Sequence, residues 1–177
     1  TVLAVESVDL PGEAVAEHVA ERTGVQPSAV YLPTYATGSI TGSVVTAARA
    51  AELAVFRLFE LGYDPMNVLS VAGSAPVAPP SADEATAMGR TNDALAYGSG
   101  VHLQVDAEFD RFDEVVSSAA AEYGTPFEDV FDAADWEFHD VPASAFGPAQ
   151  VTVDVLGGGT HVHGERREDL LAESFGL

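Results

Sequence analysis

Residues 39–61, with the sequence SITGSVVTAARAAELAVFRLFEL, carry the clearest helical periodicity of the chain. Their apolar side chains recur at spacings of three and four, which places them on one face of a helix: Ile40, Val44, Ala47, Ala51, Val55 and Leu58. Gly62 follows at once and is typical of a helix end. The sequence therefore predicts one continuous amphipathic helix over residues 39–61.

Strands and helices alternate on both sides of this helix. Predicted strands cover residues 1–7, 29–32, 67–72, 101–105 and 136–139, with a late hairpin of 151–156 and 160–163 around a glycine triplet. Further predicted helices cover residues 11–22, 82–97 (loosened at Gly89), 109–123, 126–133 and 169–175. Because the strands gather late, we predict a layered α/β (α+β) fold with a mixed or largely antiparallel sheet packed with helices.

The charge of the chain is strongly negative. Asp and Glu total 28 against 7 basic residues, all of them Arg, for a net charge of −21. Such a charge repels nucleic acids and anionic membranes, so we expect neither as a partner. The acidic residues are scattered among apolar segments and do not form a tail, which favours adaptation to high salt.

Composition also narrows the class of protein. Apolar residues make up 47% of the chain, enough for a folded core, and there is no cysteine for disulfides, thiolate catalysis or metal binding. No apolar run is long enough to cross a bilayer, and residues 1–7 lack the features of a signal peptide. We expect a cytoplasmic protein, and the abrupt start in a strand indicates a piece of a longer chain.

The string GRTND, residues 89–93, is the first candidate site. Arg90 and Asp93 are three residues apart, so they share a face of the predicted helix. A carboxylate held beside a guanidinium stays ionised and can accept a proton from water. Thr91 and Asn92 add neutral hydrogen-bonding groups, and the proline-rich loop of residues 73–81 precedes the helix. On spacing alone, an ordinary surface ion pair is the more common explanation.

Residues 37–43, TGSITGS, form a second candidate. Glycine and hydroxyl residues at the start of a helix can hold an anion on free N–H groups. The alternative is simple N-capping by Ser39, with Gly42 allowing close packing. No lysine is present, so the segment is not a nucleotide P-loop.

His161 and His163 place two imidazoles on one face of a predicted strand. Two ligands are too few for a zinc site, and a third would have to come from His18, His102 or His139. The alternative is an exposed hairpin edge. We therefore expect no bound metal.

Several motifs together resemble the methenyltetrahydromethanopterin cyclohydrolase family. The string AMGRTND at residues 87–93 is similar to a signature of that family. Other matching segments follow in the family's order and cover nearly the whole chain: residues 15–20, 30–32, 38–44 with 48–49 and Glu52, 73–79 and 173–177. The chain departs from the family in two ways. Family members are considerably longer, and the acidic residue after GRTN, which is Asp or Glu in the family, is Asp93 here.

The resemblance implies that residues 1–177 are the C-terminal portion of a two-domain cyclohydrolase whose N-terminal part is absent. The implied substrate is a methenyl-tetrahydropterin, built on tetrahydromethanopterin or tetrahydrofolate. Water adds to its bridging carbon and leaves a formyl group. No metal or redox cofactor is implied, because the methenyl cation is already a good electrophile. The family implies a homo-oligomer, with a trimer expected.

The resemblance also implies roles for residues. Asp93 would take the proton from water and Arg90 would orient Asp93. The implied substrate-binding residues are Thr91, Asn92, Gly73, Ser74, Ala75, Pro76, Ser39 and Ser43. Two other classes remain open: a non-catalytic pterin- or nucleotide-binding or assembly domain, and a metal-dependent hydrolase that uses His161 and His163.

Overall fold

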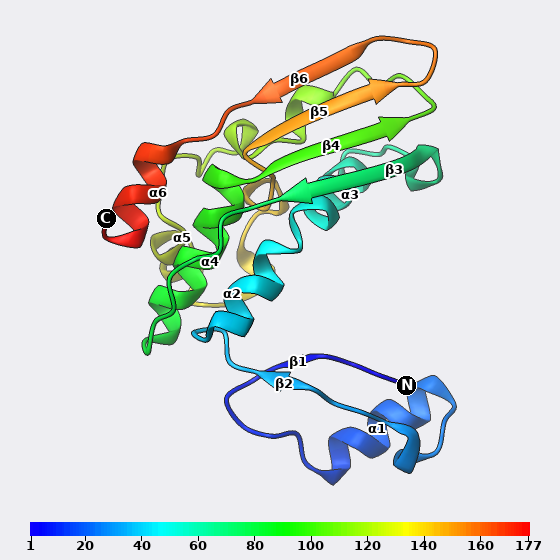
Figure 1. The fold of residues 1–177 in the computed structure, drawn as a ribbon, viewed down its shortest axis with the longest axis vertical. Coiled ribbons are helices and arrows are strands. Elements are labelled where there is room, and N and C mark those ends of the chain that lie inside the picture. Colours follow the sequence, from blue (N-terminus) through cyan, green and yellow to red (C-terminus); the bar gives the residue numbers. More distant parts are fainter.

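The computed structural model describes residues 1–177, and it begins with a small unit that stands apart from the main sheet (Figure 1). In this unit, strands β1 (Val5–Glu6) and β2 (Thr34–Tyr35) pair in parallel, and helix α1 (Glu13–Thr23) connects them. The expected buried strand at residues 1–7 is shorter and partly exposed. The expected strand at 29–32 is replaced by the 3-10 turn η1 (Pro27–Ala29) and a single bridge at Tyr31.

The predicted long helix is two helices, α2 (Ile40–Ala47) and α3 (Ala50–Glu60), so the prediction of one continuous helix was wrong. They meet at residues 48–49, where the N–H of Arg49 bonds the carbonyl of Thr46 in the tighter 3-10 manner. Beyond this turn α3 packs on strands of the main sheet, whereas α2 packs against helix α4. The break therefore lets each half bury its own apolar face.

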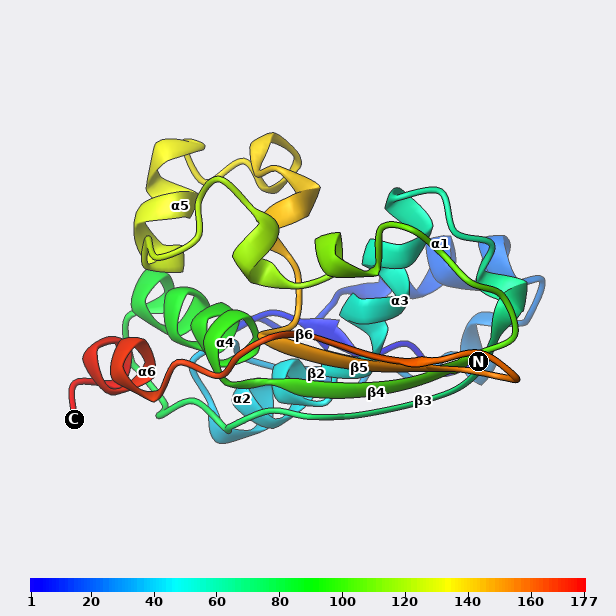
Figure 2. The same ribbon diagram turned by 90° about the horizontal axis from the view of Figure 1, so that it is seen from above.

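The main sheet has four strands, β3 (Val68–Ser74), β4 (Gly100–Val105), β5 (Gln150–Val155) and β6 (Thr160–Gly164), adjacent in that order. The β3–β4 and β5–β6 pairs are antiparallel and the β4–β5 pair is parallel, which confirms the predicted mixed sheet. One face carries a valine- and leucine-rich core that includes Leu103 and Val153, both fully buried. On the other face His102 and Gln104 are exposed. Figure 2 shows α3 and α5 on one side of the main sheet, whereas α2 lies on the other side of β3 in that view.

Helix α4 (Glu84–Gly98) is the central helix and contacts α2, α5 (Phe127–Ala133) and α6 (Glu168–Phe175). Its N-terminus is capped by Asp83, whose carboxylate accepts the N–H of Thr86 at 2.8 Å. The helix continues through Gly89 without the expected loosening. A Cβ at that position would lie 2.9 Å from the Cβ of Glu128, so this glycine allows α4 and α5 to approach closely.

The segment between β4 and β5 is built largely from short turns. A helix over 109–123 and an edge strand over 136–139 were wrong predictions: the structure has the 3-10 turns η3 (Phe112–Glu114), η4 (Ser117–Ala119) and η5 (Phe138–Asp140). Ser117 leaves the helical pattern because its N–H bonds Pro148 and its hydroxyl bonds Ala96. Asp135 and Trp136 have positive φ angles, which interrupt any extended strand there.

None of the helices has both the length and the apolar content needed to span a membrane. The predicted closing helix and the predicted β5–β6 hairpin are both confirmed.

Candidate functional site

Asp93 is the only carboxylate among the buried residues and exposes 2% of its surface. It lies on the side of α4 that faces α5 and α6. Its Oδ1 accepts the backbone N–H of Phe127 at 3.0 Å, and its Oδ2 accepts the hydroxyl of Ser174 at 2.6 Å. A carboxylate has about four lone-pair positions, so roughly two remain available for a further donor such as water.

Burial raises the pKa of Asp93 above its ordinary value, because the charged form loses solvation. The hydrogen bonds from Ser174 and Phe127 lower the pKa in part, since they stabilise the charged form. The nearby carboxylates of Glu128 and Asp129 raise it again by repulsion. The result is a carboxyl group that binds a proton more readily than an exposed aspartate, which suits a general base.

Arg90 does not pair with Asp93, so the predicted ion pair between them was wrong. The two residues do lie on the same side of α4, as their spacing indicated. Each finds its partner on α6 instead: the Nε of Arg90 donates to the carbonyl of Ser174 at 3.1 Å. A single residue, Ser174, therefore contacts both members of the motif.

Asp93 borders a cavity of about 330 Å³ between α4, α5 and α6. This volume falls at the lower end of the range for small-molecule sites. The lining is mostly polar and includes several carboxylates: Asp93, Tyr97, Gly124, Pro126, Glu128, Asp129, Leu170, Glu173 and Ser174. The negative lining favours a cationic ligand over an anionic one.

Thr91 and Asn92 point elsewhere. The hydroxyl of Thr91, which is buried, and the Nδ2 of Asn92 both donate to the carbonyl of Met88 within α4. Asn92 also lines a second cavity of about 380 Å³, with aromatic side chains such as Phe56 and Phe138. Thr91 and Asn92 thus do not share the cavity of Asp93.

The remaining predicted binding residues are also dispersed. Gly73 packs closely on α3, where a Cβ would meet the backbone nitrogen of Ala51 at 2.7 Å. Ser74 borders a shallow depression at the end of β3, and Pro76 packs against Gly98, with Ala75 half-buried between them.

Ser39 and Ser43 lie at the start of α2. Ser39 caps α2 by accepting the N–H of Gly42 at 3.0 Å, and Ser43 is buried one turn later. This is the capping alternative that the residue preferences allowed. The structure does not bring Ser39, Ser43 and the 73–76 segment together with Asp93 in one cavity.

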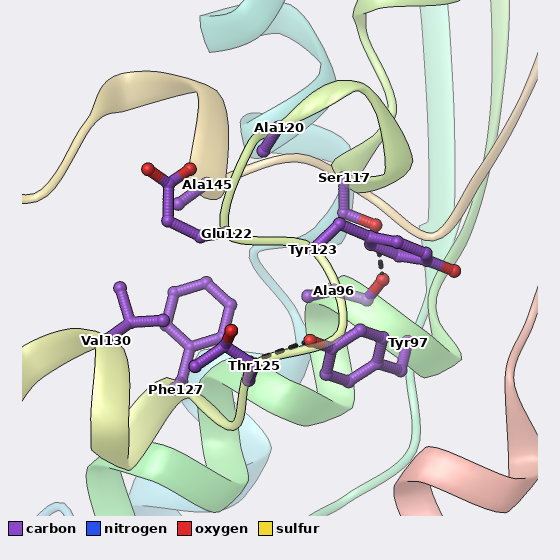
Figure 3. Close-up of a pocket in the computed structure, with 10 residues that line it drawn as sticks. All are labelled: Ala96, Tyr97, Ser117, Ala120, Glu122, Tyr123, Thr125, Phe127, Val130 and Ala145. Carbon is purple, nitrogen blue, oxygen red and sulfur yellow. Dashed lines mark hydrogen bonds between the residues drawn. The ribbon is translucent and has the colours of Figure 1, made fainter.

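A third cavity, shown in Figure 3, lies beside the C-terminal half of α4 under Tyr97 and Tyr123. Its volume is about 10 Å³, which is room for roughly one water molecule. The hydroxyl of Tyr97 donates to the carbonyl of Thr125 at 2.9 Å and accepts the N–H of Gly124 at 3.1 Å. The cavity is too small for a pterin ring, and these bonds hold the loop before α5.

The histidines do not assemble a metal site. His161 and His163 do share a face of β6, with stacked rings 6.3 Å apart, but the Nε2 of His161 lies 3.2 Å from Glu108. His102 lies 2.6 Å from Asp154, at a distance suited to a hydrogen bond. No group of three or more His, Cys, Asp or Glu side chains has a metal-binding arrangement.

The structure adds two groups that sequence reasoning missed, the hydroxyl of Ser174 and the backbone N–H of Phe127. Ser174 belongs to the terminal segment 173–177, whose similarity to the family was visible, but its role depends on how α6 packs. A backbone N–H carries no sequence signal, so Phe127 could not have been identified in advance.

Comparison with known proteins identifies the family. The family model described as Cyclohydrolase (MCH) matches residues 1–175. A protein of Halobacterium salinarum named methenyltetrahydromethanopterin cyclohydrolase is 60% identical over 99% of this chain and 57% of its own length. Proteins of the same name from Methanocella arvoryzae and Rhodopirellula baltica are each 40% identical, over 99% and 97% of this chain and 56% and 54% of their own lengths.

The chain spans about half the length of the curated relatives it matches. The Halobacterium relative agrees with the adaptation to high salt that the charge indicated. The collinear motifs, the match over residues 1–175 and the 60% identity agree: this chain belongs to the methenyltetrahydromethanopterin cyclohydrolase family.

Proposed function

We propose that this chain forms part of an enzyme that hydrolyses the cyclic methenyl bridge of a methenyl-tetrahydropterin to the formyl derivative. Membership of the cyclohydrolase family supports the reaction class. The observation that carries the assignment of a site is Asp93, a carboxyl group of raised pKa that is buried at the edge of a cavity. The chain would act as the C-terminal portion of a longer, two-domain protein.

In the proposed reaction a water oxygen attacks the bridging carbon, which carries the positive charge of the methenyl group. Asp93 accepts a proton from that water as the new C–O bond forms. One C–N bond then breaks, the released nitrogen takes a proton and the carbon remains on the other nitrogen as a formyl group. The overall reaction consumes one water and releases one proton. A cationic electrophile demands little of its base, so a carboxylate is sufficient.

Electrostatics support a cationic substrate at this cavity. Glu128, Asp129 and Glu173 line it beside Asp93. Their negative charge would attract the methenyl cation and be less favourable to the neutral formyl product.

The carrier is proposed from the names of the relatives, which point to tetrahydromethanopterin. Tetrahydrofolate is the alternative carrier. The test is to incubate the complete protein in molar KCl with each methenyl substrate and to follow the loss of methenyl absorbance. Hydrolysis of one substrate identifies the carrier, whereas hydrolysis of neither contradicts the proposal.

A non-catalytic role is the second candidate, and the burial of Asp93 is the observation that favours it. A carboxylate with 2% exposure and two internal hydrogen bonds also suits a purely structural role. The substitution Asp93→Asn separates the two, because only catalysis requires a group that can take a proton.

Assembly, location and cofactor use complete the proposal. A homo-oligomer, expected to be a trimer, is proposed from the family resemblance, and light scattering of the purified protein in molar salt would test it. Cytoplasmic location and hydrolysis without a metal or redox cofactor are proposed on the same basis. Elemental analysis of the active protein tests the last point, and stoichiometric zinc lost together with activity would contradict it.

A further inference from the structure

Residues 1–36, which hold β1, α1 and β2 and are called the N-terminal unit below, have almost no core of their own. Of the 43 buried residues in the chain, Ala20 is the one that lies in this unit. A folded segment of fewer than about 40 residues usually needs disulfides, a metal or an assembly partner for stability. The unit has no cysteine and no group of side chains arranged for a metal, so a partner has to supply the missing contacts.

The N-terminal unit exposes large apolar side chains on more than one side. Val2 and Leu3 expose 70% and 47% of their surfaces, and consecutive residues of an extended segment point to opposite faces. Neither face of the segment that contains β1 is therefore covered. Further exposed apolar side chains come from the loop before α1, from α1 and from the bridge to β1: Val8, Leu10, Val15 and Tyr31. So many of them within 36 residues are typical of an interaction surface.

The strand pair of the unit is of the kind found inside larger sheets. β1 and β2 run parallel, and the N–H groups of Leu3, Val5 and Ser7 all donate across to the second strand. Parallel sheets occur almost only with both faces covered, and their strands are near-continuous apolar runs such as VLAV at residues 2–5. The sheet has no third strand, so both outer edges present unpaired backbone groups. Two strands alone are too few for independent stability.

The rest of the described chain does not cover this surface. The hydrogen bonds from the unit to the remainder end at residues 37–39: the hydroxyl of Thr37 donates to the carboxylate of Glu6, and Ser39 donates to the carbonyl of Ala36. Figure 1 shows the unit, in blue, apart from the main sheet and joined to α2 by one connection. The apolar side chains of the unit thus remain exposed although the main sheet and its helices are complete around their own core.

We propose that the N-terminal unit is a docking surface for the portion of the complete protein that lies outside residues 1–177. The chain covers 57% of the Halobacterium relative, which leaves well over a third of that protein to supply the occupant. The docked portion adds a strand to a free edge of the β1–β2 pair and covers its open apolar face. A boundary between two structural units therefore falls within this chain, at residues 37–39.

This inference rests on one part of the proposed function, namely that the chain is a portion of a longer protein. It does not depend on the identity of the catalytic base. A second copy of the chain is the alternative occupant, and charge makes it less favourable. The unit carries five acidic residues and one basic residue, Arg22, so two copies placed face to face would oppose like charges. A covalently linked portion also acts at a high effective concentration.

Hydrogen exchange of the complete protein in molar KCl tests the proposal without a substrate. If the unit is docked, the amides of residues 3–7 and 31–35 should exchange at least about 10³-fold more slowly than in an unstructured peptide, because they open only with the surrounding fold. The amides of β4 and β5 serve as the internal reference for a buried sheet. Exchange of the two N-terminal segments near the unprotected rate would overturn the proposal.

The variants Val2→Asp and Val162→Asp form a matched pair. Each places a carboxylate at an exposed valine of an extended segment, and the two exposed fractions in this chain are 70% and 59%. Under docking, Val2→Asp buries a carboxylate without a partner and should lower the protection of residues 31–35 by at least about 10²-fold. Val162→Asp should leave the protection of those residues unchanged. Unchanged protection in Val2→Asp would contradict docking on this surface.

Dilution separates the two occupants. Protection by another portion of the same chain does not depend on protein concentration, whereas protection by a second copy falls on dilution. A fall on dilution would overturn the proposal in favour of self-association. None of these measurements uses turnover, so a complete protein that hydrolyses neither methenyl substrate would contradict the proposed function and leave the docking result intact.

Discussion

Replacement of Asp93 by Asn tests the candidate base while it preserves the surroundings. The Oδ1 of the new side chain can still accept the N–H of Phe127, and its Nδ2 can donate to the hydroxyl oxygen of Ser174. Shape and hydrogen bonding are therefore kept, and the ability to take a proton is lost. We expect the variant to fold and to bind the pterin nearly as well as the wild type.

The expected loss of turnover is about 10²–10⁴-fold, the usual contribution of a positioned general base. At about 1.36 kcal/mol for each factor of ten, this equals roughly 2.7–5.4 kcal/mol of transition-state stabilisation. Loss of either hydrogen bond to the charged carboxylate would contribute about 1.5–3 kcal/mol, which is at most roughly 150-fold. A decrease of several hundredfold thus cannot be attributed to altered packing around Asp93.

Asp93→Asn should lower turnover but raise the free energy of unfolding. The dependence of that free energy on pH gives an independent check. The pKa of Asp93 is raised in the folded state by burial, so the folded state holds the proton more tightly than the unfolded chain. This contribution is fully present below the unfolded pKa of about 3.9 and is lost as the pH rises through the folded pKa. Between the two values the wild type should lose about 1.4 kcal/mol per pH unit relative to Asp93→Asn.

The assay combines steady-state hydrolysis with urea unfolding of both proteins at a series of pH values in molar KCl. Turnover of Asp93→Asn within a few-fold of the wild type would refute the assignment of the base. A difference in unfolding free energy that stays constant across the pH series would refute the raised pKa of Asp93. The family assignment would survive both outcomes, because it rests on the match over residues 1–175.

Three further predictions follow from the fold and the charge. Arg90→Lys keeps the positive charge but loses the Nε donor to Ser174, so turnover should fall by about tenfold, and Arg90→Ala should be slower still in the same assay. Gly89→Ala places a Cβ against Glu128 and should lower the free energy of unfolding, measured in urea, by about 1–3 kcal/mol. An unchanged free energy of unfolding would contradict the close approach of α4 and α5. The melting temperature should drop sharply in dilute buffer, where charges interact over about 30 Å instead of about 3 Å at 1 M salt, and equal melting in both would refute salt adaptation.

Several strands and helices were predicted correctly from local sequence patterns. Residues 101–105 alternate between buried and exposed side chains, and the strands of the β5–β6 hairpin alternate between more and less buried ones, so the structure confirms both predictions. The helix predicted for residues 82–97 is likewise confirmed as α4, which the structure shows to be capped by Asp83. In these segments the local preference and the tertiary packing favour the same conformation.

Predictions failed where distant contacts outweigh local preference. The turn at residues 48–49 exists because α2 and α3 pack on different partners, and no pattern within residues 39–61 reports that. The region 109–123 lost its predicted helix to bonds from Ser117 to Ala96 and Pro148.

The candidate site shows the same contrast between local sequence patterns, which were informative, and distant contacts, which were not predictable. Spacing correctly placed Arg90 and Asp93 on one side of a helix, but it could not reveal that Ser174, far along the chain, lies between them. A spacing rule describes one helix, whereas the partners of its side chains depend on which other helix packs there.

The order of strands in the main sheet has a consequence for the speed of folding. Among the adjacent pairs only β5 and β6 are joined by a short loop, residues 156–159, and such hairpins form in roughly 1–10 μs. The central parallel pair β4–β5 must wait until residues 106–149 have looped back, a non-local closure of the kind that slows folding by orders of magnitude. During that delay the apolar edge of the hairpin stands exposed to other chains, and dense acidic charge then keeps the incomplete molecules apart. Refolding at high protein concentration should therefore aggregate more as salt screens that repulsion, even though the same salt stabilises the finished fold.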